Sequence, residues 1–370
     1  MKNITKSTHT RADVQKDFPA ATPIYQNSAF ESQSDYFYTR LNNPNVAELE
    51  DAIRILENTE FGLSTTTGMS AIQLSLSLLK PGQRILVNKH VYGCSFKLIQ
   101  WYTEHYGLEL IVSDLSLDTI DNKLSEMDMV FFETPTNPFL HTIDISKVSK
   151  RFKQRNSNCL IVVDNTWATP LYQSPCSLGG DISLHSATKY ISGHSDVMGG
   201  ILLTNREDVA QELRTRRFYT GANLDPNSAW LLRRSLHTLD VRLERQAINT
   251  KRLVEYLKTK QEVQKVYYPK VDGIQLTKYA TLIFMDLDEN VIQNYLDFCS
   301  HLKLFSTGTG MACVTSMIAQ PFTGSHASMD ECEKEDMGLD KSTIRLSFGM
   351  EDPEDLINDL ENAFVQIKSL

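Results

Sequence analysis

Short apolar runs of strand length alternate with helix-length segments through the first two hundred residues of the chain. The runs lie at 85–87, 108–112, 129–132, 160–163, 182–184 and 201–203. Apolar residues recur at helical spacing in segments at 46–56, 69–79 and 145–152. Asn45 is placed to cap the first of these helices. Strands without polar alternation, interleaved with helices, are typical of a mostly parallel sheet covered on both faces, so we predict an α/β fold here.

The pattern changes after Arg206. A long helical region is predicted at 227–257, followed by a strand at 280–287, a helix at 291–302, a strand at 343–348 and a helix at 353–367. Strands mixed with helices predict a smaller α+β domain. We place the boundary inside the long helix, which gives an α/β domain at 42–240 and a C-terminal domain at 241–370. Residues 1–41 are polar and irregular and are expected to form an extended arm that contacts a neighbouring subunit.

Composition and charge exclude several classes of protein. The 370 residues are 41% hydrophobic and 22% charged, and the net charge of -9 is not gathered into blocks. This argues against nucleic acid and anionic membrane as partners. Six scattered cysteines without a C-x-x-C pair predict free thiols and no metal site. The N-terminus lacks an apolar core and no run of about eighteen apolar residues occurs, so we expect a cytoplasmic protein that does not span a membrane.

Four features with chemical potential would meet if they lie at the carboxyl edge of one parallel sheet. The first is Thr67-Gly68-Met69 at a helix N-terminus, whose free N–H groups suit a phosphate; a simple glycine turn is the alternative. The second is Asp164 directly after a buried strand. Its carboxylate could keep a pyridinium nitrogen protonated and so make the ring an electron sink. The alternative is an N-cap or turn residue.

The third and fourth features are an aromatic ring and a lysine. Tyr92 follows a predicted strand and could stack on a planar cofactor, although an aromatic residue there is more often part of the core. Lys189 lies between small hydroxylated residues, Ser186 and Thr188 among them. In a dry, electropositive pocket such a lysine loses its proton and bonds covalently to a carbonyl group. A surface lysine in a loop is the alternative.

The order and spacing of these features resemble the Cys/Met-metabolism family of pyridoxal-phosphate enzymes, also called the cystathionine gamma-synthase or trans-sulfuration family. The resemblance covers nearly the full length. Its most specific part is Asp164-Asn165-Thr166 combined with Ser186-Ala187-Thr188-Lys189 and the following His194-Ser195-Asp196. Further matching segments lie at 23–26, 38–40, 43–44, 67–71, 133–138 and 344–352.

The resemblance implies a fold type I PLP-dependent transferase, with a mostly parallel seven-stranded sheet in the large domain and a smaller α+β C-terminal domain. It implies pyridoxal 5'-phosphate as the cofactor, Lys189 as its covalent anchor and proton shuttle, and Tyr92 as the stacking group and the acid or base nearest the leaving group. The other implied contacts are Asp164 at the pyridine nitrogen, Asn137 near the 3-hydroxyl, Gly68, Met69, Ser186 and Thr188 at the phosphate, Tyr38 and Arg40 from a neighbouring subunit, and Arg345 at the substrate α-carboxylate. A shared site implies a homodimer as the minimal active unit and a homotetramer as a dimer of dimers.

Departures from the family pattern gather around the substrate. Cys94 stands where the family commonly has glycine and methionine gamma-lyases have cysteine, so it is a candidate substrate contact or a small buried side chain. Arg217-Phe218 stands where those lyases have a Lys-Asp pair. The family's Ser-Leu-Gly segment is replaced near 308–312, and the connection between residues 269 and 280 is shorter than usual.

Cys94 favours γ-elimination from a sulfur amino acid, which releases a 2-oxo acid, ammonia and a thiol, whereas Arg217-Phe218 makes the match to those lyases partial. Protons must leave Cα and then Cβ, and one lysine on a flexible stem can reach both. The alternative is γ-replacement on an O-acylhomoserine by a cystathionine gamma-synthase or a sulfhydrylase. A catalytically idle relative and an aminotransferase are further alternatives; the intact motif series opposes both.

Overall fold

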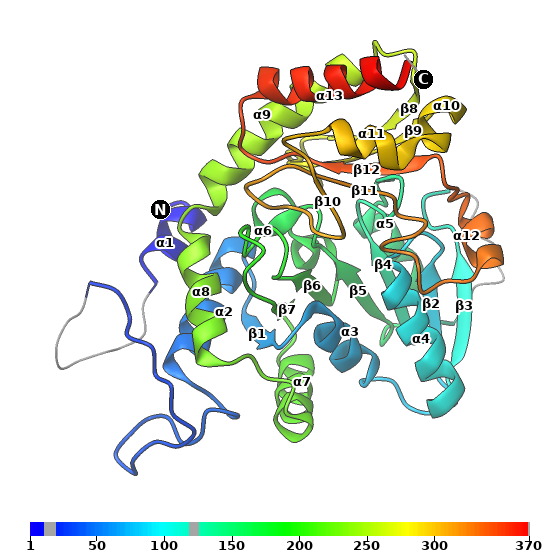
Figure 1. Ribbon diagram of the computed structural model, residues 1–370. Coiled ribbons are helices and arrows are strands. Elements are labelled where there is room, and N and C mark those ends of the chain that lie inside the picture. The colour runs from blue at the N-terminus through cyan, green and yellow to red at the C-terminus, as the bar shows by residue number, and fades with distance from the viewer. Residues whose placement is uncertain (11–19, 118–125, 369–370) are drawn as a thin grey trace.

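The structure is a computed structural model that describes residues 1–10, 20–117 and 126–368 (Figure 1). Its central sheet has seven strands in the order β1-β7-β6-β5-β4-β2-β3. Neighbouring strands are parallel except at β7, which is antiparallel to both β1 and β6. The predicted mostly parallel sheet is confirmed, and β1 is the strand that the apolar pattern did not predict. The strands are β1 (Phe61–Thr65), β2 (Arg84–Asn88), β3 (Glu109–Ser113), β4 (Met129–Glu133), β5 (Leu160–Asp164), β6 (Ile182–Ser186) and β7 (Gly200–Thr204).

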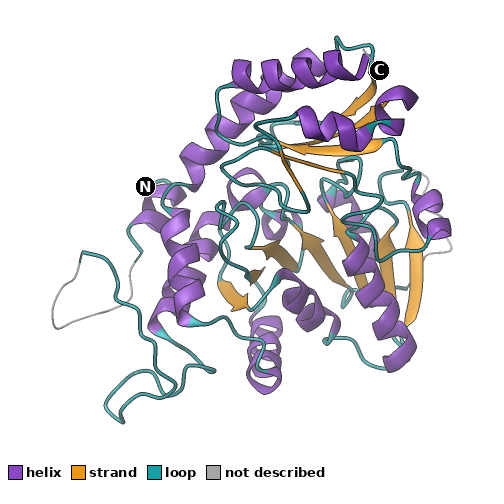
Figure 2. Ribbon diagram, viewed as in Figure 1, coloured by secondary structure: helices purple, strands orange, loops and turns teal. Residues whose placement is uncertain are grey.

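Helices cover both faces of this sheet (Figure 2). The central strands are apolar on both sides because alternate residues enter different clusters: Val162 packs with α3, α4 and α7, whereas Ile161 and Val163 pack with α5. Helices α2, α6 and α8 contribute to a further cluster together with residues of β7. The helices are α2 (Pro44–Glu57), α3 (Gly68–Leu76), α4 (Gly93–Tyr106), α5 (Ile145–Lys153), α6 (Thr169–Tyr172), α7 (Glu207–Thr220) and α8 (Pro226–Leu236).

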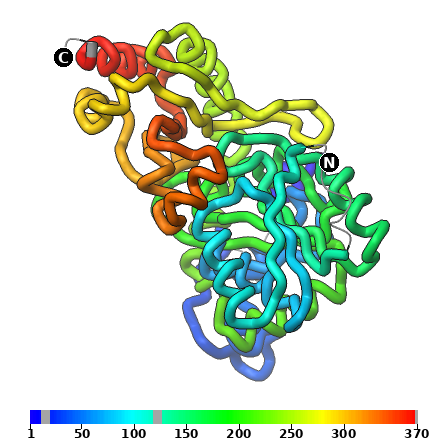
Figure 3. Tube along the Cα trace, turned by 90° about the vertical axis from the view of Figure 1, so that its right-hand side faces the viewer, coloured from blue at the N-terminus to red at the C-terminus, as the bar shows by residue number. Residues whose placement is uncertain are grey.

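A second, five-stranded sheet with the order β10-β11-β12-β9-β8 forms the C-terminal domain. Figure 3 shows these elements gathered at one end of the molecule. An apolar cluster joins this sheet to α9, α11 and α13. The elements are α9 (Leu239–Leu257), β8 (Val263–Tyr267), β9 (Leu282–Leu287), α10 (Glu289–Gln293), α11 (Tyr295–His301), β10 (Ser306–Thr307), β11 (Met317–Ala319), α12 (Glu331–Met337), β12 (Thr343–Ser347) and α13 (Pro353–Lys368).

Two predicted helices are each a pair of helices. The region at 227–257 is divided into α8 and α9 at residues 237–238. Arg242, which is buried, reaches back from α9 and donates to the carbonyl oxygen of Ser235, so the break is stabilised by a side chain that local periodicity does not reveal. The predicted helix at 291–302 is likewise divided into α10 and α11 at Asn294.

The N-terminal segment differs from its prediction in two ways. Residues Asn3–Thr8 form a helix, α1, instead of irregular chain, and Arg233 of α8 donates to the carbonyl oxygens of Ser7 and Thr8. Residues 11–19 of the predicted arm lie outside the described residues. The cap of α2 is Asn43 and not Asn45, because Pro44 occupies the first helical position and Asn43 accepts the backbone N–H of Asn45.

Candidate active site

Three neighbouring strands end at the same edge of the central sheet in polar residues. Glu133 is the last residue of β4, Asp164 of β5 and Ser186 of β6. Glu133 and Asp164 are register partners in the parallel pair of β4 and β5. Of the four features predicted to meet at this edge, Asp164 lies on it directly, and Lys189 follows three residues after the end of β6.

Asp164 is held as a buried carboxylate with its own donors. Its side chain is 9% exposed, and Oδ1 accepts the backbone N–H of Thr166 at 3.0 Å and the hydroxyl of the same residue at 2.5 Å. Burial raises the pKa of Asp164, while the hydrogen bonds from Thr166 and the nearby His185 act in the opposite direction. The geometry suits an acid that faces a protonated ring nitrogen.

The start of α3 forms a cradle for an anion beside Ser186. The Thr67 side chain caps the helix by accepting the N–H of Ser70, which leaves the first N–H groups of the helix without partners inside it. A Cβ atom at Gly68 would lie 2.9 Å from the Cβ of Ser186, so only glycine allows this approach. The Thr188 hydroxyl donates to the carbonyl oxygen of Gly199 at 3.3 Å and accepts the N–H of the same residue at 3.1 Å, so its one proton would have to turn away from Gly199 to bind an anion.

Lys189 lies in a hollow of about 680 Å³ with Thr67 and Thr188. Burial lowers the pKa of its amine, and the positive charge of Arg345 lowers it further. Both effects favour the neutral amine, which is the reactive form of a lysine nucleophile or base. The surface-lysine alternative is therefore not supported by the structure.

Arg345 of β12 brings a cation to this site from the C-terminal domain. Its side chain is 2% exposed, and Nη2 donates to the carbonyl oxygens of Thr309 and Gly310, each at 3.2 Å. Nη1 is buried and has no hydrogen-bond partner among the described residues. A buried guanidinium nitrogen without a partner is expected to receive an anionic oxygen, as a substrate carboxylate would supply.

Tyr92 directly precedes α4 and is linked to both sides of the site. Its backbone N–H donates to Oε1 of Glu133 at 2.7 Å, and its hydroxyl is hydrogen-bonded to the thiol of Cys94. Burial and the contact with Cys94 raise the pKa of the Tyr92 hydroxyl, although Arg345 opposes the shift. The hydroxyl therefore remains protonated near neutral pH and is available as a proton donor.

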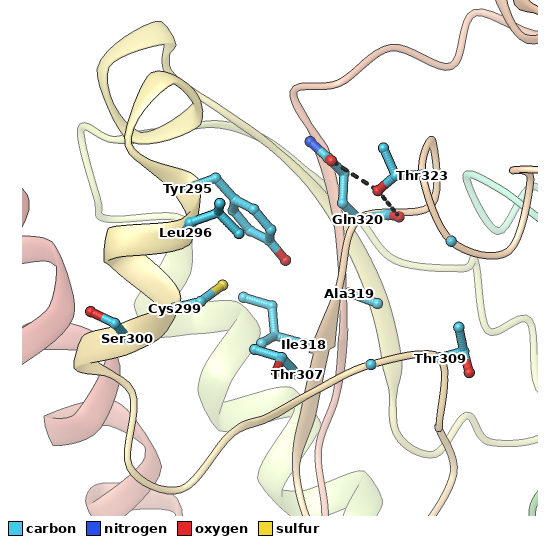
Figure 4. A pocket seen from close by; sticks show the side chains of 12 residues that line it. Tyr295, Leu296, Cys299, Ser300, Thr307, Thr309, Ile318, Ala319, Gln320 and Thr323 are labelled. Atoms are coloured by element: carbon cyan, nitrogen blue, oxygen red, sulfur yellow. Dashed lines mark hydrogen bonds between the residues drawn. The ribbon is translucent and has the colours of Figure 1, made fainter.

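A second hollow of about 480 Å³ adjoins the first at Thr309, which lines both. Figure 4 shows the Tyr295 hydroxyl directed into it from α11, opposite Ile318 and Gln320. The Thr323 hydroxyl donates to the side-chain oxygen of Gln320 at 3.1 Å on that opposite side. All twelve lining residues are neutral, so this hollow carries no charged group for a charged ligand.

Tyr38 and Arg40 are not brought to Lys189 of the same chain. Nη1 of Arg40 donates to the carbonyl oxygen of Phe218 at 2.7 Å, and its guanidinium lies 4.1 Å from the centre of the Phe218 ring. Tyr38 is 37% exposed. The segment that precedes α2 projects from the body of the molecule (Figure 1), and neither residue lines the hollow that holds Lys189.

The departures near the substrate have structural counterparts. Arg217 is buried and pairs with Glu50 at 2.5 Å, so it supports α7 and β1 and does not line either hollow. The replaced segment at 308–312 provides the carbonyl oxygens that hold Arg345. The Sγ atom of Cys94 lies 3.9 Å from the Ser328 hydroxyl, so this residue faces the C-terminal domain as well as Tyr92.

Sequence reasoning gave no role to Glu133, to His326 or to the pair of Glu57 and His185. Glu133 ends a buried strand as Asp164 does, so the same signal was present. His326 is buried against the backbone of Val91 and Asn137, and Nε2 of His185 lies 2.5 Å from Oε2 of Glu57. These contacts join segments that are far apart in the chain, so no local sequence pattern predicts them.

The residues present fit pyridoxal phosphate. Besides the cradle at Gly68 and Ser186, the Oδ1 atom of Asn137 is buried without a hydrogen-bond partner in the described chain, as a residue facing a ring hydroxyl would be. Asp164 and Lys189 supply the charge and the amine. Among described residues, no cluster of three or more His, Cys, Asp or Glu side chains could hold a metal ion. None of the described helices is long and apolar enough to cross a bilayer.

Relatives in sequence and in structure identify the family of the chain. The chain is 36% identical to a cystathionine beta-lyase of Lactococcus lactis subsp. cremoris, with 93% of both chains covered. It is 35% identical to an L-methionine gamma-lyase of Fusobacterium nucleatum subsp. polymorphum, with 94% of both covered. A crystal structure of cystathionine gamma synthase from Xanthomonas oryzae pv. oryzae in complex with cystathionine superimposes with a TM-score of 0.94 at 31% identity, covering 100% of this chain and 99% of that one. The model of one family, described as Cys/Met metabolism PLP-dependent enzyme, matches residues 5–365, and the chain belongs to that family.

Proposed function

We propose that the protein is a carbon–sulfur lyase that removes the sulfur substituent of an amino acid by γ-elimination, giving a 2-oxo acid, ammonia and a thiol. The observation that carries the proposal is the grouping of three residues. A lysine with a lowered pKa lies near a buried guanidinium with an unpartnered nitrogen, and a tyrosine that keeps its proton interacts with the same guanidinium. The name of the Lactococcus relative, a cystathionine beta-lyase, supports a carbon–sulfur lyase, and the name of the Fusobacterium relative, an L-methionine gamma-lyase, also supports cleavage at the γ position.

In this proposal, Lys189 holds the cofactor covalently, Asp164 pairs with its ring nitrogen and Asn137 lies near its hydroxyl. Gly68, Met69, Ser186 and Thr188 hold its phosphate, with Tyr38 and Arg40 of a neighbouring subunit. When bound, pyridoxal phosphate supplies an electron sink for the negative charge that develops on the substrate. The ring of Tyr92 would stack on it.

The chain's own groups move the protons. Arg345 orients the substrate through its α-carboxylate, which places Cα and Cβ within reach of a single base. Once the substrate amine has displaced it from the cofactor, Lys189 would take a proton from Cα as a neutral amine. It would have to give that proton up before it could take a second one from Cβ. The Tyr92 hydroxyl, which keeps its proton at neutral pH, donates it to the departing sulfur.

A substrate panel tests the proposal. Methionine, cystathionine and cysteine are each incubated with the cofactor-loaded protein, and the 2-oxo acid is identified by its carbon number. We expect a four-carbon 2-oxo acid from methionine or cystathionine without any added thiol. A three-carbon acid from cystathionine would show β-elimination and overturn the γ assignment. No 2-oxo acid from any member of the panel would overturn the lyase proposal.

A second candidate is γ-replacement on an O-acylhomoserine, and the close superposition on the Xanthomonas cystathionine gamma synthase favours it. The assay that separates the two uses an O-acylhomoserine with and without a thiol. A thioether product that forms only with added thiol, while 2-oxo acid stays absent in both cases, would establish the synthase.

We also propose a homodimer as the minimal active unit, assembled in pairs into a homotetramer. The support is that neither Tyr38 nor Arg40, which the family resemblance places at the phosphate, lines the hollow that holds Lys189 in the same chain, and that Arg40 contacts Phe218 instead. Sedimentation of the cofactor-loaded protein tests this proposal. A monomer with full activity would contradict it.

A further inference from the structure

Glu133 holds the backbone at the start of α4 through a hydrogen bond to Tyr92. Its side chain is 3% exposed, and Oε1 accepts the backbone N–H of Tyr92 at 2.7 Å. The side chain of Trp167 lies close to this carboxyl group. Tyr92 is the residue before the helix and its side chain makes no capping bond, so the contact with Glu133 fixes the backbone that carries the ring.

Glu133 also has a close carboxyl neighbour. It is the register partner of Asp164 across β4 and β5, and both side chains are buried. Two carboxylates in one buried site cannot both be ionised at low cost, and unequal surroundings decide which one carries the charge.

The surroundings of the two acids differ. Asp164 receives two hydrogen bonds on one oxygen from Thr166, and His185 on β6 lies near it, held in turn by Glu57 of α2. Among the described residues, Glu133 accepts the neutral N–H of Tyr92 and lies close to the neutral side chain of Trp167, and both contacts act to lower its pKa. Burial raises the pKa of Glu133 well above its usual range, and the charge of Asp164 raises it further.

We infer that Glu133 is the positioning residue for Tyr92, and that it acts as a neutral acid that leaves the single negative charge of the strand ends on Asp164. A neutral anchor holds the tyrosine without competing with Asp164 for a positively charged ring nitrogen. This inference rests on the proposed function for the role of Tyr92 in turnover, but its effect on cofactor binding does not depend on which substrate is cleaved.

The test compares Glu133→Gln with Glu133→Ala in the full-length protein. Glutamine keeps the acceptor and the shape of a protonated glutamate, so we expect kcat and the cofactor dissociation constant to stay within about threefold of the parent protein. Alanine removes the anchor, and a misplaced catalytic group typically lowers turnover by about 100-fold. For Glu133→Ala we therefore expect the loss to fall on kcat with little change in KM, together with a weaker cofactor complex measured by equilibrium titration of the apoprotein.

Asp359→Asn is the matched control, because Asp359 is a buried carboxyl group that accepts the backbone N–H groups of Lys303 and Leu304 away from the site. This control should lower the urea midpoint without changing kcat per folded enzyme. If Glu133→Gln loses as much kcat and cofactor affinity as Glu133→Ala, an ionised carboxylate is required and the inference is wrong. If Glu133→Ala matches the parent protein in both measurements, Glu133 positions nothing. A parent protein that binds cofactor but cleaves no substrate defeats the proposed function alone, since the cofactor titrations still compare the variants.

Discussion

The two walls of the site are built in different ways. On the cofactor side, Glu133, Asp164 and Ser186 are the terminal residues of neighbouring strands, so strand length and register place them. On the carboxylate side, Arg345 lies in the middle of β12 and is held by carbonyl oxygens of the loop between β10 and β11. A loop can change length or sequence without moving the strand ends, and so this architecture separates the choice of substrate from the retention of cofactor chemistry.

The substitution with the largest expected effect removes the amine of Lys189, which lies between the two sides of the site. Lys189→Ala should lower turnover by about 10⁴-fold, because the same group moves both protons. The phosphate cradle and Asp164 remain, so the variant should still bind cofactor reversibly in equilibrium dialysis. Lys150→Ala, an exposed lysine of α5, is the control and should behave as the parent protein. Normal turnover by Lys189→Ala would remove this lysine from the mechanism.

The second-largest effect is expected from substitutions of Arg345, which change only the side of the site proposed to bind the substrate carboxylate. Arg345→Ala should raise KM by about 100-fold, since a charged hydrogen bond contributes about 1.5–3 kcal/mol. Arg345→Lys should recover only part of this, because lysine lacks the planar fork. The positive charge of Arg345 helps to lower the pKa of Lys189, so cofactor uptake by Arg345→Ala should shift to higher pH. An unchanged KM would place the carboxylate elsewhere.

His326 packs between the C-terminal domain and the loops at Val91 and Asn137, and we expect the stability of the protein to fall at low pH because of this residue. Burial lowers the pKa of His326 to about 4, below its ordinary 6.5. The unfolded chain therefore binds a proton at His326 at a higher pH than the folded protein does. The contribution of neutral His326 to the free energy of unfolding is fully present above pH 6.5, and it is lost as the pH falls from 6.5 toward 4. We expect about 2 kcal/mol to be lost between pH 7 and pH 5.

Urea unfolding at the two pH values measures this loss, and His326→Gln should reduce it. His90 and His141, whose pKa values burial also lowers, should leave a residual slope. An identical pH dependence in parent and variant would show that His326 is not the group responsible.

The smallest expected effect concerns the residues supplied by the projecting segment. Arg40→Ala should weaken cofactor binding about tenfold, as loss of one charged phosphate contact would. Mixing this variant with Lys189→Ala should restore part of the activity, because some mixed dimers contain one intact site. No recovery at any mixing ratio would mean that Arg40 serves its own subunit.

The same contrast explains how far the sequence could be interpreted. The strand that ends in Asp164 is buried and apolar up to that residue, so its presence followed from the pattern. The strand that ends in Ser186 was predicted from Ile182 and Leu184, although Ser183 and His185 interrupt its apolar run. The short strands β10 and β11 have three residues or fewer, and no residue of β8 is fully buried, so none of them has a periodic signature. The division between α8 and α9 depends on Arg242, which contacts chain before and after it.

For the site, the residues assigned to the cofactor were predicted by motifs that lie at strand ends or on the loops that follow them. The carbonyl oxygens at Thr309 and Gly310 come from a loop that only tertiary packing places beside Arg345. The contact of His326 with the loops near Tyr92 and Asn137 is of the same kind. Sequence periodicity carries no information about such long-range contacts.

Gly93 sets a limit for anyone who wishes to redesign the leaving-group side of this enzyme. A Cβ atom there would lie 3.0 Å from the Cα atom of His326 and 3.0 Å from the carbonyl oxygen of Ser325, and both are backbone atoms that cannot rotate away. Most substitutions at Gly93 would push the backbone at Ser325 and His326 away from α4. Diversity is better introduced at Cys94 and Ser328, which meet side chain to side chain across the same contact.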